Sequence, residues 1–211
     1  MSKTTFESWL HLQKRAQNTV SLYLYAVAQF KQLYGRISLD KLQKYKLYLI
    51  ENFKTKTVNI RICGINAYLE YLGKKEWQLA HVKLQQKPYL ENVISQPDYE
   101  YLRDSLLKDG RKKWHFIVRF LAATGARISE LLKIKVEHVK IGYLDINSKG
   151  GKTRRIYIPE SLRKSALEWL TEAKIESGFI FLNRRGKVMT PTGLGGKLKK
   201  LGVEYGLDAQ V

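Results

Sequence analysis

The spacing of apolar residues constrains this chain most, because from residue 5 to residue 75 it repeats with the period of an α-helix. Apolar side chains recur three and four positions apart, which places them on one face of a helix. Thr19 and Ser38 stand at N-cap positions, and Gly35 and Gly73 stand where helices should end. We therefore predict four helices, which cover residues 5–14, 19–35, 38–53 and 57–75. They form a first domain over residues 1–82.

The rest of the chain predicts a linker and a second domain of mixed structure. The helical period fades before Pro88, and we assign residues 83–92 to a linker. Residues 93–211 form the second domain, which opens with two helices that end at Gly110 and Gly125. Further on we expect a β-hairpin from residues 136–147 and 154–159, a helix over 160–177, a short buried strand over 179–182 and a last helix over 190–206. The fold class is therefore mainly α with a small β-hairpin.

The charge of the chain points to a polyanionic partner. Among 211 residues, 38 Lys and Arg face 19 Asp and Glu, so the formal net charge is +19. Residues 1–92 carry +9 and residues 93–211 carry +10, interleaved throughout with aromatic and aliphatic residues. A disordered basic tail would instead concentrate the charge in one block. The alternative interpretation is a basic surface that serves only solubility.

Other residue types narrow the function by what they lack. Cys63 is the single cysteine, so an internal disulfide is impossible and a reducing compartment fits. The histidines have no cysteine or carboxylate at metal-ligand spacing, and we predict no metal site; they are His11, His81, His115 and His138. The first residues contain no apolar signal segment, and no stretch reaches the roughly 18 apolar residues that a membrane span needs. We expect a soluble intracellular protein.

The most informative segment is LAATGARISELLKI, residues 121–134. A glycine turn places Arg127 at the start of a short amphipathic helix, where backbone N–H groups already favour an anion. A guanidinium adds two parallel hydrogen bonds to phosphate oxygens. The alternative interpretation is that Arg127 forms an ordinary surface ion pair with Glu130, three residues further on.

A second basic segment, INSKGGKTRRIYIP, is expected at the tip of the hairpin. It carries Lys149 and Lys152 around a Gly-Gly turn, with Arg154 and Arg155 behind them. The functional hypothesis is a lysine that reaches into DNA. The alternative is a solvated basic hairpin that touches phosphates without taking part in chemistry.

Together, ATGARISELL and, 22 residues after its arginine, SKGGK with an alternating RRIYIP strand resemble the catalytic domain of the tyrosine recombinase, or phage integrase, family. The first domain adds to the resemblance, because QNTVSLYLYAVAQF is similar to the opening helix of the family's core-binding domain and INAYLEYL to its last helix. The resemblance implies a four-helix, SAM-like core-binding domain followed by part of an α+β catalytic domain.

The resemblance also implies roles for individual residues. Arg127 corresponds to the phosphate-binding arginine, Glu130 to a supporting acid, Lys149 to the lysine that protonates the leaving 5′ oxygen and Lys152 to a phosphate contact. In the family a tyrosine attacks the phosphate to give a 3′-phosphotyrosine, without metal or cofactor. Phosphoryl transfer of this kind asks mainly for positioned positive charge and an activated nucleophile.

The chain departs from the family pattern after the hairpin. It contains no H-x-x-R sequence and no histidine after His138, and its last tyrosine, Tyr205, is expected to pack rather than to attack a phosphate. We therefore expect the 211 residues to stop before that box and before the nucleophile. The functions left are part of a recombinase that binds DNA without cleaving it, a non-catalytic DNA-binding protein derived from a recombinase, or an unrelated RNA-binding or structural protein.

Double-stranded DNA is the expected partner. Asn59 and Arg61 would read base edges if the last helix of the first domain enters the major groove, and Arg154 would contact DNA from the hairpin. The resemblance implies a tetramer on two DNA sites, whereas this chain by itself is expected to be a monomer in solution. The expected location is the cytoplasm, in association with the nucleoid.

Overall fold

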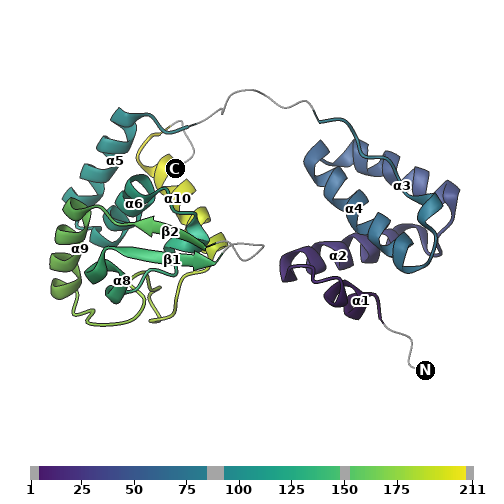
Figure 1. Cartoon of the computed structure of the whole chain (residues 1–211). Coiled ribbons are helices and arrows are strands. Elements are labelled where there is room, and N and C mark those ends of the chain that lie inside the picture. The colour runs from purple at the N-terminus through teal and green to yellow at the C-terminus, as the bar shows by residue number, and fades with distance from the viewer. Residues whose placement is uncertain (1–4, 85–92, 148–152, 208–211) are drawn as a thin grey trace. The chain divides into compact units, whose positions relative to one another are not determined.

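The computed structural model describes residues 5–84, 93–147 and 153–207 (Figure 1). The chain divides into two compact units, Met1–Pro88 and Tyr89–Val211. Within residues 5–84, all regular secondary structure of the first unit is helical. The second contains helices and one two-stranded antiparallel sheet. The structure therefore has the mainly α class with a small hairpin that the sequence predicts.

The first unit contains the four expected helices, followed by one 3-10 turn. They are α1 (Phe6–Leu12), α2 (Gln17–Tyr34), α3 (Leu39–Asn52), α4 (Thr55–Tyr71) and η1 (Lys75–Trp77). The Ser38 side chain caps α3, as predicted, by accepting a bond from the Lys41 N–H. The N-cap predicted at Thr19 is wrong, because α2 begins at Gln17. The Ala16 carbonyl accepts from the Thr19 and Val20 N–H groups, so the first turn closes without a side-chain cap.

The core of the first unit depends on close packing between α2 and α4. Phe30, Tyr45 and Ile62 are fully buried between the helices. A Cβ added at Gly64 of α4 would lie 2.9 Å from the Ala26 Cβ, so glycine is what lets the two helices approach this closely. The buried Tyr45 has a partner for its polar group, because its hydroxyl donates to Gln29 Oε1 at 2.8 Å.

Side chains of α4 bind the backbone of the segment that follows η1. Asn66 accepts from the Leu79 N–H at 2.8 Å and donates to its carbonyl at 2.9 Å. Asn59 binds Val82 in the same way, with both distances 2.9 Å. Asn59 and Asn66 lie seven residues apart, about 10.5 Å along a helix. This matches the roughly 10 Å that three residues of extended chain span, so both pairs form at once.

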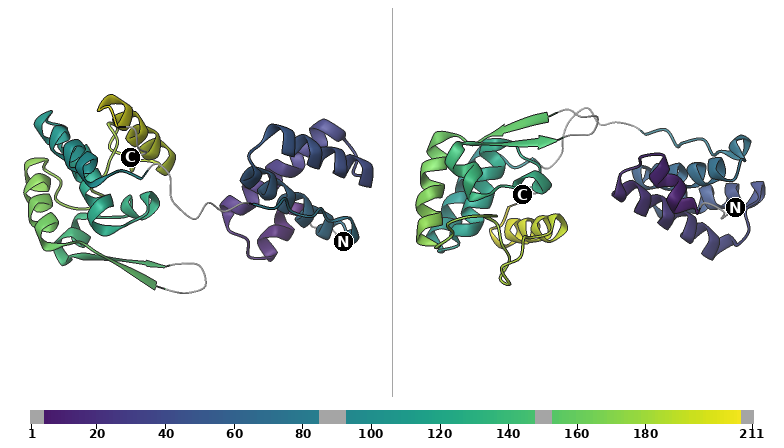
Figure 2. Two further views of the ribbon diagram at one scale, coloured as in Figure 1. Left: turned by 90° about the horizontal axis from the view of Figure 1, so that it is seen from above. Right: turned by 60° about the horizontal axis from the view of Figure 1, so that its bottom comes forward.

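The second unit contains six helices and one hairpin among its described residues. They are α5 (Gln96–Lys108), α6 (Lys112–Thr124), α7 (Ile128–Leu131), α8 (Val136–Ile141), β1 (Tyr143–Asn147), β2 (Thr153–Tyr157), α9 (Glu160–Glu172) and α10 (Pro191–Glu204). Strands β1 and β2 pair in register from Tyr143 with Tyr157 to Asn147 with Thr153. The two views in Figure 2 show the hairpin along the outside of the unit.

Two strand predictions are wrong in the second unit. Residues 136–141 form α8 instead of the start of the hairpin, because the buried Val136 and Val139 lie three positions apart. The Lys135 N–H bonds to His138 Nδ1 at the start of α8, and Gly142, at φ +89°, ends it. Residues 179–182 form isolated bridges instead of a strand, one from Phe179 to Lys135 and one from Leu182 to Val188.

A hydrophobic core joins the helices of the second unit to the inner face of the hairpin. Phe120 of α6, Ile156 of β2 and Leu198 of α10 are all buried in it. Gly195 of α10 lies against α7, where an added Cβ would meet Ile128 Cδ1 at 3.6 Å. Helix α7 is thus held by packing as well as by its own hydrogen bonds. Within the described ranges of both units, no helix has the length and hydropathy to cross a bilayer.

Candidate active site

A tight turn between α6 and α7 positions the arginine that the sequence singles out. Gly125 adopts the left-handed conformation at φ +58°, and its N–H bonds to the Leu121 carbonyl at the end of α6. The Thr124 hydroxyl donates to the Phe120 carbonyl and accepts from the Ala126 N–H. These bonds satisfy the end of α6 and direct the chain outward at the next residue, Arg127.

Arg127 and Glu130 form a pair in which the carboxylate is buried and the guanidinium is exposed. Glu130 Oε2 accepts from the Arg127 backbone N–H at 2.9 Å, and Oε1 accepts from Arg127 Nη1 at 2.8 Å. The Glu130 side chain is 8% exposed, whereas that of Arg127 is 69% exposed. The predicted alternative, an ordinary surface ion pair, therefore describes only one of the two partners. Glu130 acts as a buried anchor for an arginine that faces solvent.

A second arginine shares this anchor. Arg154 Nη1 lies 3.6 Å from Glu130 Oε2, and its Nη2 donates to the Gly125 carbonyl at 3.2 Å. The strand register puts Arg154 on the core-facing side of β2, while Arg155 faces outward and pairs with Asp145. Arg154, which the sequence predicts to contact DNA, therefore also has a structural role, because its side chain links the hairpin to the α6–α7 turn. The alternation in RRIYIP predicts that the two arginines lie on opposite faces of the strand. It does not predict that Arg154 contacts Glu130.

The pair of arginines keeps Glu130 ionised. Burial by itself raises the pKa of the Glu130 carboxyl, but hydrogen bonds from the Arg127 N–H and guanidinium, with the positive charge of Arg154, outweigh it. The net effect lowers the pKa below the usual value of a glutamate. The cluster therefore carries one negative and two positive charges at neutral pH, with the positive excess turned toward solvent.

This arrangement can bind an oxyanion. A guanidinium has five N–H donors, and the described contacts of Arg127 use one of them. The remaining donors can form the parallel bonds that suit phosphate oxygens. Helix α7 has only four residues, so its dipole contributes little compared with the guanidinium charge. The anion preference thus rests on Arg127 and Arg154 more than on the helix start that the sequence suggested.

The two lysines predicted at the hairpin tip, Lys149 and Lys152, lie outside the described residues. Their convergence with Arg127 on one phosphodiester therefore stays a prediction. The described strands bring the flanking residues Asn147 and Thr153 together as a pair at the end of the hairpin. Next to Thr153, Arg154 connects the described part of the hairpin to the turn that carries Arg127.

The residues predicted to read bases have intramolecular contacts in the first unit. Both ends of the Asn59 amide bind Val82, so base reading by Asn59 would require two hydrogen bonds to open. The Arg61 guanidinium lies 3.9 Å from the centre of the Tyr25 ring. Its Nη1 is buried and has no hydrogen-bond partner among the described residues. The structure thus engages Asn59 within its own unit, and Arg61 rests on an aromatic ring that is 55% exposed.

Tyr205 packs near the end of α10. Its hydroxyl donates to Asp109 Oδ2 at 2.6 Å, and the Arg111 guanidinium lies 5.7 Å from its ring centre. Burial, followed by the hydrogen bond to Asp109, raises the pKa of Tyr205 to about 12. A phenol held in this way is a poor nucleophile at neutral pH.

The described part of the chain contains no group of three or more His, Cys, Asp or Glu side chains that could hold a metal ion. Two of the histidines there contact other groups of the protein through a ring nitrogen. His115 is buried and its Nδ1 pairs with the Arg103 carbonyl at 2.7 Å, while His81 Nε2 lies 3.2 Å from Cys63 Sγ.

Comparison with known proteins places this chain in a class. The phage integrase family model matches residues 92–211, which is more than half of the chain. The chain therefore belongs to the phage integrase family. It is 26% identical to tyrosine recombinase XerA of Pyrococcus furiosus over 211 residues, covering 96% of this chain and 73% of that protein. It is 28% identical to the TnP I resolvase of Bacillus thuringiensis, covering 89% of this chain and 75% of that one.

Solved structures support the same fold. A lambda integrase dimer bound to a COC′ core site has a TM-score of 0.72 at 14% identity, with 97% of this chain and 63% of that chain covered. XerH recombinase bound to a difH substrate has a TM-score of 0.69 at 17% identity, with 91% and 63% covered. At these identities the likeness establishes the architecture.

Proposed function

We propose that this chain acts in site-specific DNA recombination, as the part of a tyrosine recombinase that binds duplex DNA and holds the target phosphate. The observation that carries the proposal is the cluster of Arg127 and Arg154 around the buried Glu130 carboxylate. Membership of the phage integrase family and the tyrosine recombinases among its relatives support it. The similar solved structures of XerH recombinase bound to a difH substrate and of lambda integrase bound to a COC′ core site add support for a DNA partner.

Each group in the cluster has a distinct task in this proposal. Arg127 binds the non-bridging oxygens of the phosphate through its free N–H donors. Glu130 positions that guanidinium, and Arg154 fixes the hairpin beside it while adding positive charge. Lys149 protonates the leaving 5′ oxygen and Lys152 contacts a neighbouring phosphate, as the family resemblance implies. Positioned charge of this kind stabilises the transition state of phosphoryl transfer, and we propose no cofactor for it.

We also propose that the 211-residue polypeptide binds DNA without cutting it. These 211 residues contain no H-x-x-R box, and the Tyr205 hydroxyl, whose pKa is raised, donates to Asp109. The same observation suits the second candidate function, a non-catalytic DNA-binding protein derived from a recombinase. In either case the chain works on the nucleoid, as a monomer when free, because its charge of +19 opposes self-association. Assembly into a tetramer would occur on DNA.

Methylphosphonate substitution tests the phosphate contact directly. A duplex in which one phosphate after another is replaced by a neutral methylphosphonate is titrated with the wild-type chain and with Arg127→Ala. We expect one position at which the substitution weakens wild-type binding by about tenfold but leaves Arg127→Ala unaffected. Arg155→Ala is the matched control, because Arg155 lies on the face of β2 opposite to Arg154. This variant should respond to the substitutions as the wild type does. Equal responses of Arg127→Ala and wild type at every position would remove Arg127 from the site.

A nicked suicide duplex tests the absence of strand cleavage. Incubation with the 211-residue chain should yield a complex that denaturing gels resolve into free protein and free DNA. A covalent protein–DNA adduct would overturn this part of the proposal, and Tyr205→Phe would then show whether Tyr205 is the attacking group. Preference for RNA over duplex DNA in competition would favour an unrelated RNA-binding function.

A further inference from the structure

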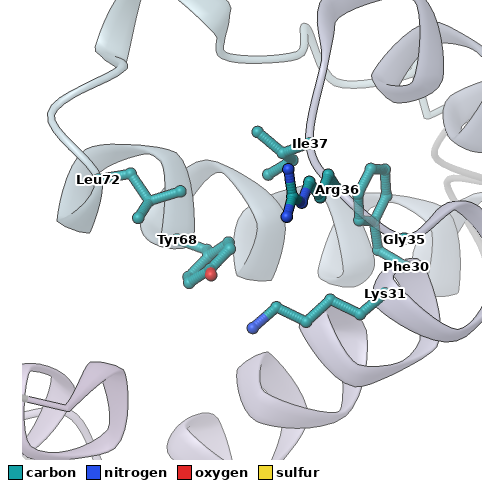
Figure 3. Close-up of a pocket in the computed structure, with 7 residues that line it drawn as sticks. All are labelled: Phe30, Lys31, Gly35, Arg36, Ile37, Tyr68 and Leu72. Carbon is teal, nitrogen blue, oxygen red and sulfur yellow. The ribbon is translucent and has the colours of Figure 1, made fainter.

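The first unit has a groove of about 440 Å³ that the DNA-binding proposal does not use. Figure 3 shows it between the end of α2, which supplies Phe30 and Lys31, and the end of α4, which supplies Tyr68 and Leu72. Arg36 and Ile37, from the connection between α2 and α3, close one side. The groove therefore lies where two helices end and the chain turns between them.

The surface of this groove is largely apolar. Phe30 is buried, and Ile37 and Tyr68 are partly buried against the same core. Leu72 is 40% exposed and stands at the edge. An exposed leucine next to two further apolar side chains is a surface that gains from being covered by another apolar group.

The charges around the groove are of one sign. Lys31 and Arg36 are the only charged residues that line it, and no acidic side chain does. Within residues 5–84, neither has an ion-pair partner among the described contacts. The Lys31 ammonium instead lies 4.9 Å from the centre of the Tyr68 ring. In Figure 3 both cationic groups extend from the α2 side toward Tyr68, over the apolar surface.

We propose that this groove binds a peptide segment of a partner protein in which an apolar side chain stands next to acidic residues. The apolar side chain would cover Phe30, Ile37 and Leu72, and the carboxylates would pair with Lys31 and Arg36. DNA is the less suitable occupant, because its phosphates could pair with Lys31 and Arg36 but a duplex backbone brings no apolar side chain to cover Phe30, Ile37 and Leu72. The proposal is independent of the arginine cluster in the second unit.

Methyl resonances of the full 211-residue chain can test the groove. The probes are two panels of short synthetic peptides, each with one Leu, Phe or Trp between flanking residues that are all Asp or Glu in one panel and all Lys in the other. We expect the acidic panel to shift the methyl signals of Ile37 and Leu72, and the lysine panel to leave them unchanged. The double variant K31E/R36E should weaken binding of the acidic peptides by about tenfold or more.

Matched variants separate the groove from general charge effects. Lys56→Glu changes an exposed lysine at the start of α4, outside the groove, and should alter peptide affinity less than about twofold. Leu72→Asp should abolish binding while leaving the far-ultraviolet circular dichroism unchanged, since Leu72 is exposed. No shift at Ile37 or Leu72 with any acidic peptide would overturn the proposal. So would displacement of the peptide by duplex DNA that shifts the same methyl groups.

Discussion

At the scale of single residues, the arginine cluster shows how a buried anion can direct an exposed cation. Arg127 has a flexible side chain, yet both its backbone N–H and its guanidinium bind one carboxylate. Glu130 can do this because it is buried and already balanced by Arg154. Charge-assisted bonds to a fixed acceptor reduce the number of orientations that the guanidinium samples before a phosphate arrives.

Glu130→Gln tests this anchoring through stability and its dependence on pH. The variant keeps the shape but loses the charge, and we expect the free energy of unfolding at pH 7 to fall by about 1–2 kcal/mol. The Glu130 pKa is lowered in the folded state, so its contribution is fully present above its unfolded pKa, near 4.3, and is lost as the pH falls through the folded value. Urea titrations of both proteins from pH 7 to pH 3 measure this. A difference between them that stays constant below about pH 4 would contradict the assignment.

At the scale of elements, the approach of α2 to α4 depends on the missing side chain at Gly64. An added Cβ would lie 2.9 Å from Ala26 Cβ and 3.0 Å from the Tyr23 Cα, and the second of these atoms belongs to the backbone. Helix propensity alone would favour alanine over glycine in the interior of a helix. Packing is therefore the stronger effect at this position.

Gly64→Ala should lower the free energy of unfolding by about 1–3 kcal/mol, because the two helices must move apart. Urea denaturation measures the change. Gly196→Ala on α10 is the control of opposite sign, since nothing lies within 4 Å of its added Cβ, and it should be neutral or stabilising by up to about 1 kcal/mol. The double variant G64A/A26G should recover part of the loss. Equal stabilisation by both alanines would show that α2 and α4 are packed less closely than described.

The asparagine pairs of α4 make a second prediction at this scale. Asn66→Ala leaves the Leu79 N–H and carbonyl without their partner, and Leu79 is 4% exposed, so about 1–3 kcal/mol of stability should be lost. Amide hydrogen exchange should quicken most at Leu79 and less at Val82, which Asn59 holds separately. Asn52→Ala is the control, because Asn52 bonds within its own helix to the Tyr48 carbonyl. Unchanged exchange at Leu79 would argue against the pairing.

Local sequence signals predicted the elements in which the apolar period repeats over many residues, and failed where elements were short. Helices α2, α3 and α4 have 18, 14 and 17 residues, which is enough turns for apolar spacing to identify them. The prediction of a strand over residues 136–141 is wrong because six residues contain too few apolar positions to distinguish a helix from a strand. The Ser38 cap was readable from its residue type, whereas the start of α2 was not, since tertiary packing outweighs a missing cap.

The site was predictable only as far as a motif runs along the chain. The proximity of Arg127 and Glu130 follows from three-residue spacing. Arg154 meets Glu130 only because the hairpin folds back over the α6–α7 turn, and no local pattern encodes that approach. In the first unit, Asn59 looked free to read a base, because its partner Val82 lies more than twenty positions away.

At the scale of the whole molecule, both units are strongly basic, with +10 on residues 1–88 and +9 on residues 89–211. Neither unit therefore needs the other to be attracted to a polyanion. Binding through many lysines and arginines releases counterions from DNA, which makes the affinity depend on salt.

The salt dependence of binding is the prediction that belongs to this scale. If six to ten phosphates are neutralised, the affinity for duplex DNA should fall by roughly 10³- to 10⁵-fold between about 50 and 200 mM salt. Fluorescence anisotropy with a labelled duplex measures the slope. Arg127→Ala should reduce the slope of log affinity against log salt by about 1, the value for one phosphate contact. K31E/R36E should leave the slope unchanged, because we place those two cations at a peptide groove. A nearly flat salt profile would exclude a phosphate-dominated interface.

The two asparagine pairs also determine where the first unit tolerates changes in length. Seven helical residues and three residues of the following segment cover the same distance, so an insertion or deletion between Leu79 and Val82 would break one pair and release the end of the unit. Between Gly73 and Gln78 the chain turns back toward α4, with Trp77 partly buried against the core, and extra residues before Trp77 would cost little closure entropy. Homologous chains should therefore vary in length before Leu79 and keep the spacing that follows it.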